Sequence, residues 1–209
     1  MITTVIFDLD LTIIDSLEAC TKGANMLAER CGLPKTDKET VIKYISLATP
    51  DFWQALWGVS QPDWMVIFNE EIIPLMTPLI KPYPGALDFL DHLRLKGYRL
   101  GLATNRVRPW IDLAQMDLAK YFDTAVGTSD TLKPKPQPDI LLAALNQLGS
   151  ASEEAIFIGD SISDMAAAKN AGLRAVGLLQ GGCTPEDLTR AGAWTVRRDL
   201  PSSGDLFMT

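Results

Sequence analysis

The stretch from Val5 to Thr12, Val-Ile-Phe-Asp-Leu-Asp-Leu-Thr, constrains this chain more than any other. Its apolar, β-branched start is typical of a buried strand. The strand ends in two aspartates, Asp8 and Asp10, and crowding two like charges raises the free energy of ionising both. Either a cation lies between the carboxylates or one of them carries a proton. Mg²⁺ would satisfy the pair, because it prefers oxygen ligands and is usually held by one or two carboxylates and a substrate phosphate.

The bulk properties exclude several classes of protein. The chain has 209 residues, 47% of them hydrophobic, which is enough for one sizeable core and a modest insertion. A formal net charge of −7 argues against a protein that binds nucleic-acid backbones. No apolar run approaches the roughly 20 residues of a membrane span, the start lacks the form of a signal peptide, and the cysteines are interpreted as reduced. We therefore expect a soluble, cytoplasmic protein with no nucleic-acid or membrane partner.

Helical patterns fill the chain from residue 16 to residue 80, and no strand signal interrupts them. Helices are predicted over 17–30, 38–47, 50–57 and 62–76. The tryptophans of this block, Trp53, Trp57 and Trp64, are interpreted as packing residues, with a place in a substrate pocket as the alternative. A stiff connector follows at 81–85, where Pro82 and Pro84 prevent any helix from continuing.

Strands and helices alternate after this connector. Strands are predicted over 98–104, 124–127, 155–159, 175–179 and 194–196, and helices over 86–96, 109–117, 138–148, 163–171 and 185–191. Such alternation indicates a parallel sheet covered on both faces. The predicted architecture is a doubly wound, Rossmann-like α/β core formed by residues 1–15 and 81–209, with an all-helical cap domain, residues 16–80, inserted after the first strand.

Ligands of such sheets bind beyond the carboxyl ends of the strands. Four separate segments of this chain carry polar side chains there, and we expect them to converge. They are Asp8, Asp10 and Thr12; Thr104 and Asn105; the loop with Lys133 and Lys135; and Asp160 with Asp164. Acid, hydroxyl and ammonium groups together are typical of a site for phosphate and metal.

These motifs resemble those of the haloacid dehalogenase-like superfamily, in its phosphoglycolate phosphatase-like branch with a helical cap. The four motifs occur in order as Asp8-Leu-Asp10-Leu-Thr12, Thr104, a lysine, and Gly159-Asp160-x-x-x-Asp164. The resemblance spans nearly the whole chain. It implies a Mg²⁺-dependent phosphatase that acts on a small-molecule phosphomonoester through an aspartyl-phosphate intermediate.

Two lysines compete for the third motif, because Lys133 and Lys135 each begin a Lys-Pro-x-Pro run. In the related phosphatases this lysine stands 25 positions before the fourth-strand aspartate. The resemblance therefore selects Lys135 over Lys133, since Lys135 has that spacing from Asp160.

The resemblance also implies a role for each motif residue. Asp8 would be the nucleophile, and Asp10 the general acid and then the general base. Phosphate would be bound by Thr12, Thr104, the backbone N–H of Asn105, and Lys135, which also supplies positive charge. The metal ligands would be Asp8, the backbone carbonyl of Asp10, Asp160 and, directly or through water, Asp164.

Two departures leave alternatives open. Relatives usually carry glycine where Leu11 stands, and the insert has Ser46 and no arginine in its specificity loop, which weakens a specific prediction of phosphoglycolate as substrate. A phosphomutase of the same fold, similar to β-phosphoglucomutase, is the nearest rival, and a non-catalytic binding or regulatory module is the other. Dehalogenase chemistry is disfavoured because those relatives lack the second aspartate, Asp10. We expect a monomer or a homodimer.

Overall fold

The computed structural model of this protein describes residues 1–128 and 133–207. Six parallel strands form its sheet in the order β5-β4-β1-β6-β7-β8. Strand β1 (Thr4–Phe7) lies in the centre, hydrogen-bonded to β4 (Arg99–Ala103) on one side and β6 (Ala155–Gly159) on the other. The remaining strands are β5 (Thr124–Val126), β7 (Arg174–Leu178) and β8 (Thr195–Arg197). The predicted doubly wound α/β fold is confirmed.

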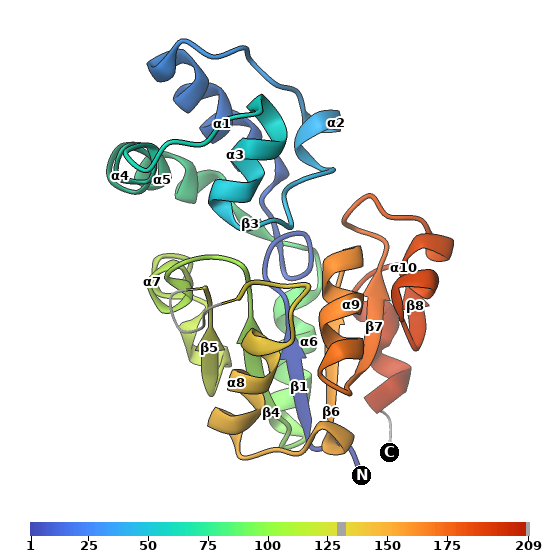
Figure 1. Cartoon of the computed structure of the whole chain (residues 1–209). Helices are drawn as coiled ribbons and strands as arrows, with labels where there is room; N and C mark the ends of the chain where they lie inside the picture. The colour runs from blue at the N-terminus through green and yellow to red at the C-terminus, as the bar shows by residue number, and fades with distance from the viewer. Residues whose placement is uncertain (129–132, 208–209) are drawn as a thin grey trace.

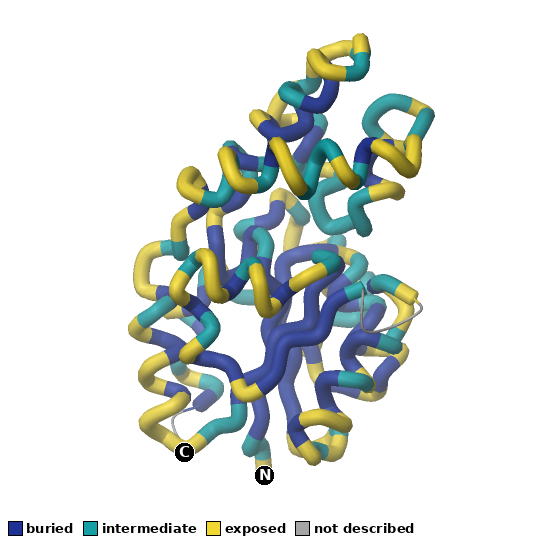
Figure 2. Tube along the Cα trace, turned by 90° about the vertical axis from the view of Figure 1, so that its left-hand side faces the viewer, coloured by how far each residue is buried: buried dark blue, intermediate teal, exposed yellow. Residues whose placement is uncertain are grey.

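Both faces of the sheet are covered because successive side chains of β1 point to opposite sides. Val5 and Phe7 belong to one hydrophobic core with residues of α6 and α7, whereas Ile6 belongs to a second core with residues of α8, α9 and α10. All four residues of β1 are buried, and Figure 2 shows the strands as a dark, buried centre within an exposed outer layer. Burial on both faces accounts for the continuous apolar run that the sequence shows.

The helices of this core alternate with its strands (Figure 1). They are α6 (Ala86–Leu95), α7 (Pro109–Gln115), α8 (Asp139–Leu148), α9 (Ile162–Asn170) and α10 (Pro185–Ala191). Short 3₁₀ turns lie at Ala119–Tyr121, Ser152–Glu154 and Pro201–Phe207. None of the helices within the described ranges is both long and apolar enough to cross a lipid bilayer.

The helical elements from Leu17 to Leu79 form an insert that lies over the carboxyl ends of the strands (Figure 1). Its helices are α1 (Leu17–Cys31), α2 (Lys38–Val41), α3 (Thr49–Trp57), α4 (Trp64–Ile67) and α5 (Ile73–Met76). A π-helical turn, Phe68–Ile72, joins α4 to α5, and a 3₁₀ turn, Thr77–Leu79, follows. The insert has its own apolar centre, in which Trp53 is fully buried.

Two features of the insert differ from the sequence prediction. The helix predicted over 38–47 ends at Val41, and turns follow to residue 46; its continuation is rich in β-branched and aromatic residues, which are poor helix formers. Two short strands were not predicted: β2 (Ile14–Asp15) and β3 (Lys81–Pro82) pair antiparallel. They form the two-stranded connection between the sheet and the insert.

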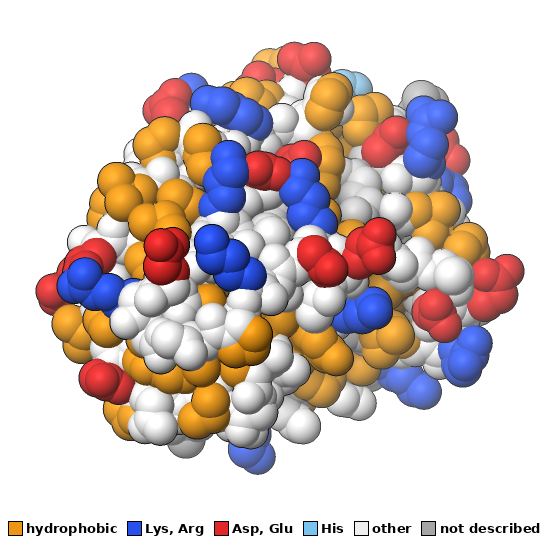
Figure 3. Space-filling view, turned by 90° about the horizontal axis from the view of Figure 1, so that it is seen from above, with side chains coloured by type: hydrophobic (Ala, Val, Ile, Leu, Met, Phe, Trp, Pro, Cys, Tyr) orange, Lys and Arg blue, Asp and Glu red, His pale blue; other side chains and the backbone are white. Residues whose placement is uncertain are grey.

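The face seen from the insert side carries charges of both signs (Figure 3). Over the described residues visible there, Lys and Arg side chains alternate with Asp and Glu rather than gathering into a basic stripe. This distribution agrees with the net charge of −7.

Candidate active site

Lys135 lies at the centre of the site, and its ammonium group is held by three acceptors. Its Nζ donates to Asp8 Oδ1 at 2.6 Å, to Asp164 Oδ1 at 2.7 Å and to the carbonyl oxygen of Ala103 at 3.0 Å. An ammonium group has three N–H donors, so every donor of Lys135 is used. Segments that are distant in the sequence therefore meet at one cation, which comes from the loop before α8 and binds the end of β1 and the start of α9.

Two carboxylates contact this lysine, and a third lies close to both of them. Ligand oxygens of Asp8, Asp160 and Asp164 lie within 4.8 Å of one another, and all three residues are buried. Burial and the charges of neighbouring acids raise the pKa of Asp8 to about 7, although the charge of Lys135 opposes the rise. Burial and the charges of Asp164 and Asp8 also raise the pKa of Asp160 well above its ordinary value. The cluster holds more negative charge than one ammonium group can neutralise.

The start of α9 fixes two of these acids. Ser161 is the N-cap residue, and its hydroxyl accepts from the backbone N–H of Asp164 at 3.1 Å. In return, Asp164 Oδ2 accepts from the backbone N–H groups of Asp160 and Ser161 at 3.2 and 3.0 Å, which completes a capping box. Close packing adds a constraint, because a Cβ placed on Gly181 would lie 1.8 Å from Asp160 Oδ2. Position 181 must therefore lack a side chain if Asp160 is to keep its place.

Thr104 and Asn105, at the end of β4, lie beside the lysine. Asn105 accepts from the backbone N–H of Lys135 at 2.9 Å, and its amide nitrogen donates to the carbonyl oxygen of Ser46 at 2.9 Å. One side chain thus links the lysine loop to the insert. Thr104 is almost fully buried and lines the same cavity as Asp8.

Asp10 does not join the acidic cluster; its side chain binds Arg106. The guanidinium donates from Nε to Asp10 Oδ2 and from a terminal nitrogen to Asp10 Oδ1, both at 2.8 Å, and it also lies 3.5 Å from Asp112. Although burial alone would raise the pKa of Asp10, the charge and hydrogen bonds of Arg106 lower it below its ordinary value. Sequence reasoning missed Arg106, and the only signal for it was a basic residue directly after Thr104 and Asn105 at a strand end.

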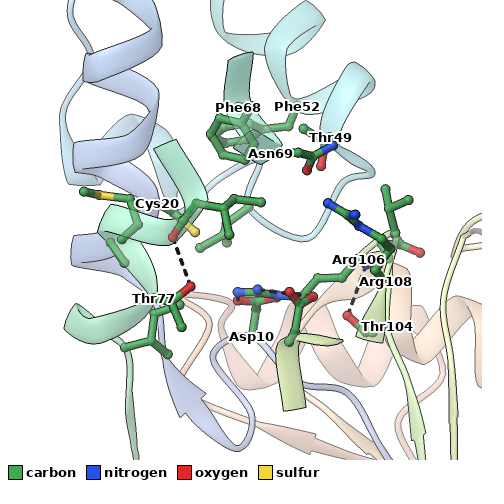
Figure 4. A pocket seen from close by; sticks show the side chains of 18 of the residues that line it. Asp10, Cys20, Thr49, Phe52, Phe68, Asn69, Thr77, Thr104, Arg106 and Arg108 are labelled. Atoms are coloured by element: carbon green, nitrogen blue, oxygen red, sulfur yellow. Dashed lines mark hydrogen bonds and ion pairs between the residues drawn. The ribbon is translucent and has the colours of Figure 1, made fainter. Parts of the chain in front are cut away.

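A cavity of about 170 Å³ opens between these residues and the insert. Its floor includes Asp8, Asp10 and Lys135, and its walls include Phe52, Phe68 and further apolar residues of the insert. Figure 4 shows Asp10, Thr104, Arg106 and Arg108 below and Thr49, Phe52, Phe68 and Asn69 above. A few polar groups surrounded by apolar side chains are typical of a binding site for a small molecule.

Comparison with known proteins assigns the family. A family model described as haloacid dehalogenase-like hydrolase matches residues 5–178. The chain belongs to the haloacid dehalogenase-like hydrolase family. A phosphoglycolate phosphatase of Escherichia coli (strain K12) is 32% identical over 204 residues, a match covering 85% of this chain and 81% of that protein. The resemblance stated from the four motifs is confirmed, and with it the prediction of an enzyme of the hydrolase class.

Solved structures agree with this assignment. A hydrolase from Pseudomonas syringae, 27% identical, has a TM-score of 0.83 over 98% of this chain and 97% of its own. A protein from Clostridium acetobutylicum described as a predicted phosphatase, 25% identical, has a TM-score of 0.83 over 99% of this chain and 97% of its own. The fold and the helical insert of this haloacid dehalogenase-like hydrolase are therefore shared along almost the full chain.

Three further residues were singled out in the sequence: Thr12, Lys133 and Leu11. Thr12 is fully buried and donates its hydroxyl to Asp160 Oδ1 at 2.9 Å, so its predicted contact with phosphate stays a prediction. Lys133 is exposed, in contrast to the buried Lys135. Leu11 is buried with φ at 56°, a left-handed conformation that favours glycine. A glycine at position 11 would adopt this conformation without strain.

The tryptophans of the insert pack against one another rather than lining the cavity. The ring centroids of Trp53 and Trp64 are 5.9 Å apart and those of Trp57 and Trp64 are 6.0 Å apart, both in edge-to-face contact. Phe52 and Phe68 provide the aromatic wall of the cavity instead. For this haloacid dehalogenase-like hydrolase, the packing interpretation of the tryptophans is the one that the geometry favours.

Proposed function

We propose that this chain is a Mg²⁺-dependent phosphatase that hydrolyses a small phosphomonoester through an aspartyl-phosphate on Asp8. The observation that carries the proposal is the contact of Asp8 with Lys135 inside a cluster of three buried carboxylates at the floor of a cavity. The similarity to phosphatases of the haloacid dehalogenase-like family supports the same chemistry.

The acidic cluster fits a divalent cation. Asp8, Asp160 and Asp164 are hard oxygen donors, and burial, followed by the charges of neighbouring acids, raises the pKa values of Asp8 and Asp160. A cation would relieve this destabilisation of the ionised carboxylates. These carboxylates, with the backbone carbonyl of Asp10, would hold Mg²⁺. When bound, the ion would supply Lewis-acid stabilisation of the phosphate and lessen its repulsion from Asp8.

Asp8 would act as the nucleophile with its second oxygen, because Oδ1 accepts from Lys135. Attack forms the bond between Asp8 and phosphorus and breaks the bond to the leaving alcohol, which takes a proton from Asp10. Water then attacks phosphorus, gives its proton to Asp10, and releases phosphate and the Asp8 carboxylate. Lys135, with its three N–H donors anchored, holds Asp8 in place and offsets negative charge throughout.

The ion pair of Asp10 with Arg106 adds one requirement to this scheme. Asp10 is held as a carboxylate here, since Arg106 lowers its pKa and binds both of its oxygens. A carboxylate can accept the proton of water, but it cannot donate one to a leaving alcohol. The first step therefore requires that Asp10 leave Arg106 and take up a proton, which substrate binding between insert and core would bring about.

The helical insert would serve as a cap that excludes bulk water from the cavity. The contact of Asn105 with the carbonyl oxygen of Ser46 joins the insert to the site itself. The size of the cavity supports a small substrate, and phosphoglycolate is the first to be tested because it names the E. coli relative.

The test measures phosphate release from a broad panel of phosphomonoesters, with and without Mg²⁺. Wild type should release phosphate from at least one ester only when Mg²⁺ is present, and Asp8→Asn should release none. Activity that survives in Asp8→Asn would refute the nucleophile assignment. Isomerisation of a sugar phosphate that depends on a sugar bisphosphate, with little net phosphate release, would identify a phosphomutase instead.

A further inference from the structure

Two of the three cations that line the cavity bind all four of its carboxylates. Lys135 binds Asp8 and Asp164, and Arg106 binds Asp10 and Asp112. Arg108 also lines the cavity, yet among the described residues no hydrogen bond or ion pair holds its side chain. The cavity therefore contains a guanidinium group whose N–H donors are not bound by any described residue, although its charge acts on the nearby Asp112.

Two polar side chains of the insert share this property. Thr49, in α3, and Asn69, in the π-helical turn, line the same cavity, and neither side chain has a hydrogen-bond partner within the described part of the chain. Figure 4 shows Arg108 rising from the core side toward Thr49 and Asn69, on the opposite side of the cavity from Asp10. Guanidinium, hydroxyl and amide donors from three elements thus face one space.

We propose that Arg108, with Thr49 and Asn69, forms a second anion-binding position that selects phosphate esters whose leaving group is itself negatively charged. This inference rests on the proposed phosphatase function, because the ester phosphate would occupy the position beside Asp8 and Lys135. A guanidinium with free N–H donors binds a carboxylate or a second phosphate through two parallel hydrogen bonds. The hydroxyl and the amide would donate to the same group from the insert.

Arg106 is less suited to this task than Arg108. Both Asp10 and Asp112 lie against its guanidinium, so an incoming anion would meet two carboxylates there. Arg108 is exposed and lines the cavity, and no carboxylate of a described residue lies within ion-pair distance of its guanidinium, although Asp112 feels its charge. The specificity loop of the insert, residues 45–50, contains no arginine. Arg108 lies on the core side of the cavity, opposite Thr49 of that loop (Figure 4).

The experiment compares two matched pairs of substrates that differ only by a carboxylate in place of an alcohol. The pairs are 2-phosphoglycolate with 2-hydroxyethyl phosphate, and 3-phosphoglycerate with glycerol 3-phosphate. Wild type should prefer the carboxylate member of at least one pair in kcat/KM. Arg108→Gln should reduce this preference about ten- to hundredfold, the loss expected for a hydrogen bond to a charged group, mainly through KM. Arg108→Lys should retain part of the preference because it keeps the charge.

Arg190→Gln is the matched control, since it removes one positive charge from an exposed arginine in α10, far from the cavity, and should leave the preference unchanged. Equal losses on both members of each pair in Arg108→Gln, or no preference in wild type, would overturn the proposal. Those outcomes would leave the phosphatase proposal standing as long as the neutral esters are hydrolysed. Failure of wild type on all four esters and on the broader panel would refute the phosphatase proposal itself.

Discussion

Mg²⁺ should stabilise the folded protein much more at pH 8 than at pH 5. The reason is the acidic cluster, in which the pKa of Asp8 is raised from an ordinary value of 3.8 to about 7. A raised carboxyl pKa means that the folded chain binds a proton more tightly than the unfolded chain. The stability that this proton contributes is fully present below about pH 4 and is lost as the pH rises through 7.

The size of the effect follows from the shift. A pKa change from 3.8 to about 7 corresponds to about 4 kcal/mol of stability lost between acidic and alkaline pH, taken at about 1.4 kcal/mol per pH unit. Asp160 shifts in the same direction and adds to the loss. At high pH a cation bound by the cluster takes the place of the lost proton. At pH 5 the cation must compete with the proton for the same carboxylates, so it adds less stability. For a chain of this size, each kcal/mol moves the melting temperature by about 2–4 °C.

Thermal unfolding followed by circular dichroism would measure this, at pH 5 and pH 8, with Mg²⁺ or with a chelator. Asp160→Asn should lose most of the Mg²⁺-dependent rise at pH 8, because the amide carries no charge. Asp91→Asn, which changes an exposed acid of α6, is the matched control and should respond like wild type. An equal Mg²⁺ response at both pH values, or an undiminished response in Asp160→Asn, would show that the cluster is not the cation site.

Three further substitutions test the local geometry. Leu11→Ala should cost about 2–5 kcal/mol of unfolding free energy because a buried side chain is lost. Leu11→Gly should cost no more than Leu11→Ala, because the φ angle of 56° favours glycine. Chemical denaturation measures both costs, and a glycine variant clearly less stable than the alanine variant would show that position 11 is not strained. Gly181→Ala should displace Asp160 and sharply lower the rate of phosphate release. Gly204→Ala is the control and should not lower it, because the space around position 204 is open. Equal rates in the two variants would show that the close packing of Gly181 against Asp160 is not needed for activity. Lys135→Ala should lower kcat far more than Lys133→Ala in steady-state assays, and the reverse order would show that the wrong lysine was chosen.

Much of the fold was predictable because the signal is local. The apolar strand at Val5 and the alternation after Pro84 each specify an element within a few residues, and a parallel sheet then places all strand ends on one edge. The residues predicted for the site follow these strand ends. Family spacing chose Lys135 over Lys133, and the structure brings Lys135 within 2.6 Å of Asp8.

The rest of the site depends on contacts that no local pattern encodes. Arg106 and Asp10 are 96 residues apart, and neither the helical period nor strand alternation reports that their side chains meet. The strands β2 and β3 have two residues each, too few to show alternation. The cavity walls, including Phe52, depend on how the insert lies over the core, which is set by tertiary packing rather than by sequence period.

The central claim is that Asp8 is phosphorylated during turnover, and a burst experiment with p-nitrophenyl phosphate tests it most directly. Its leaving group needs no proton, so Asp10→Asn should still transfer the phosphoryl group to Asp8 but fail to activate water. We predict one equivalent of nitrophenolate released rapidly in the presence of Mg²⁺, and a phosphoryl group located on Asp8 by mass spectrometry of the quenched protein. Absence of a burst, or a phosphoryl group on any residue other than Asp8, would contradict the account.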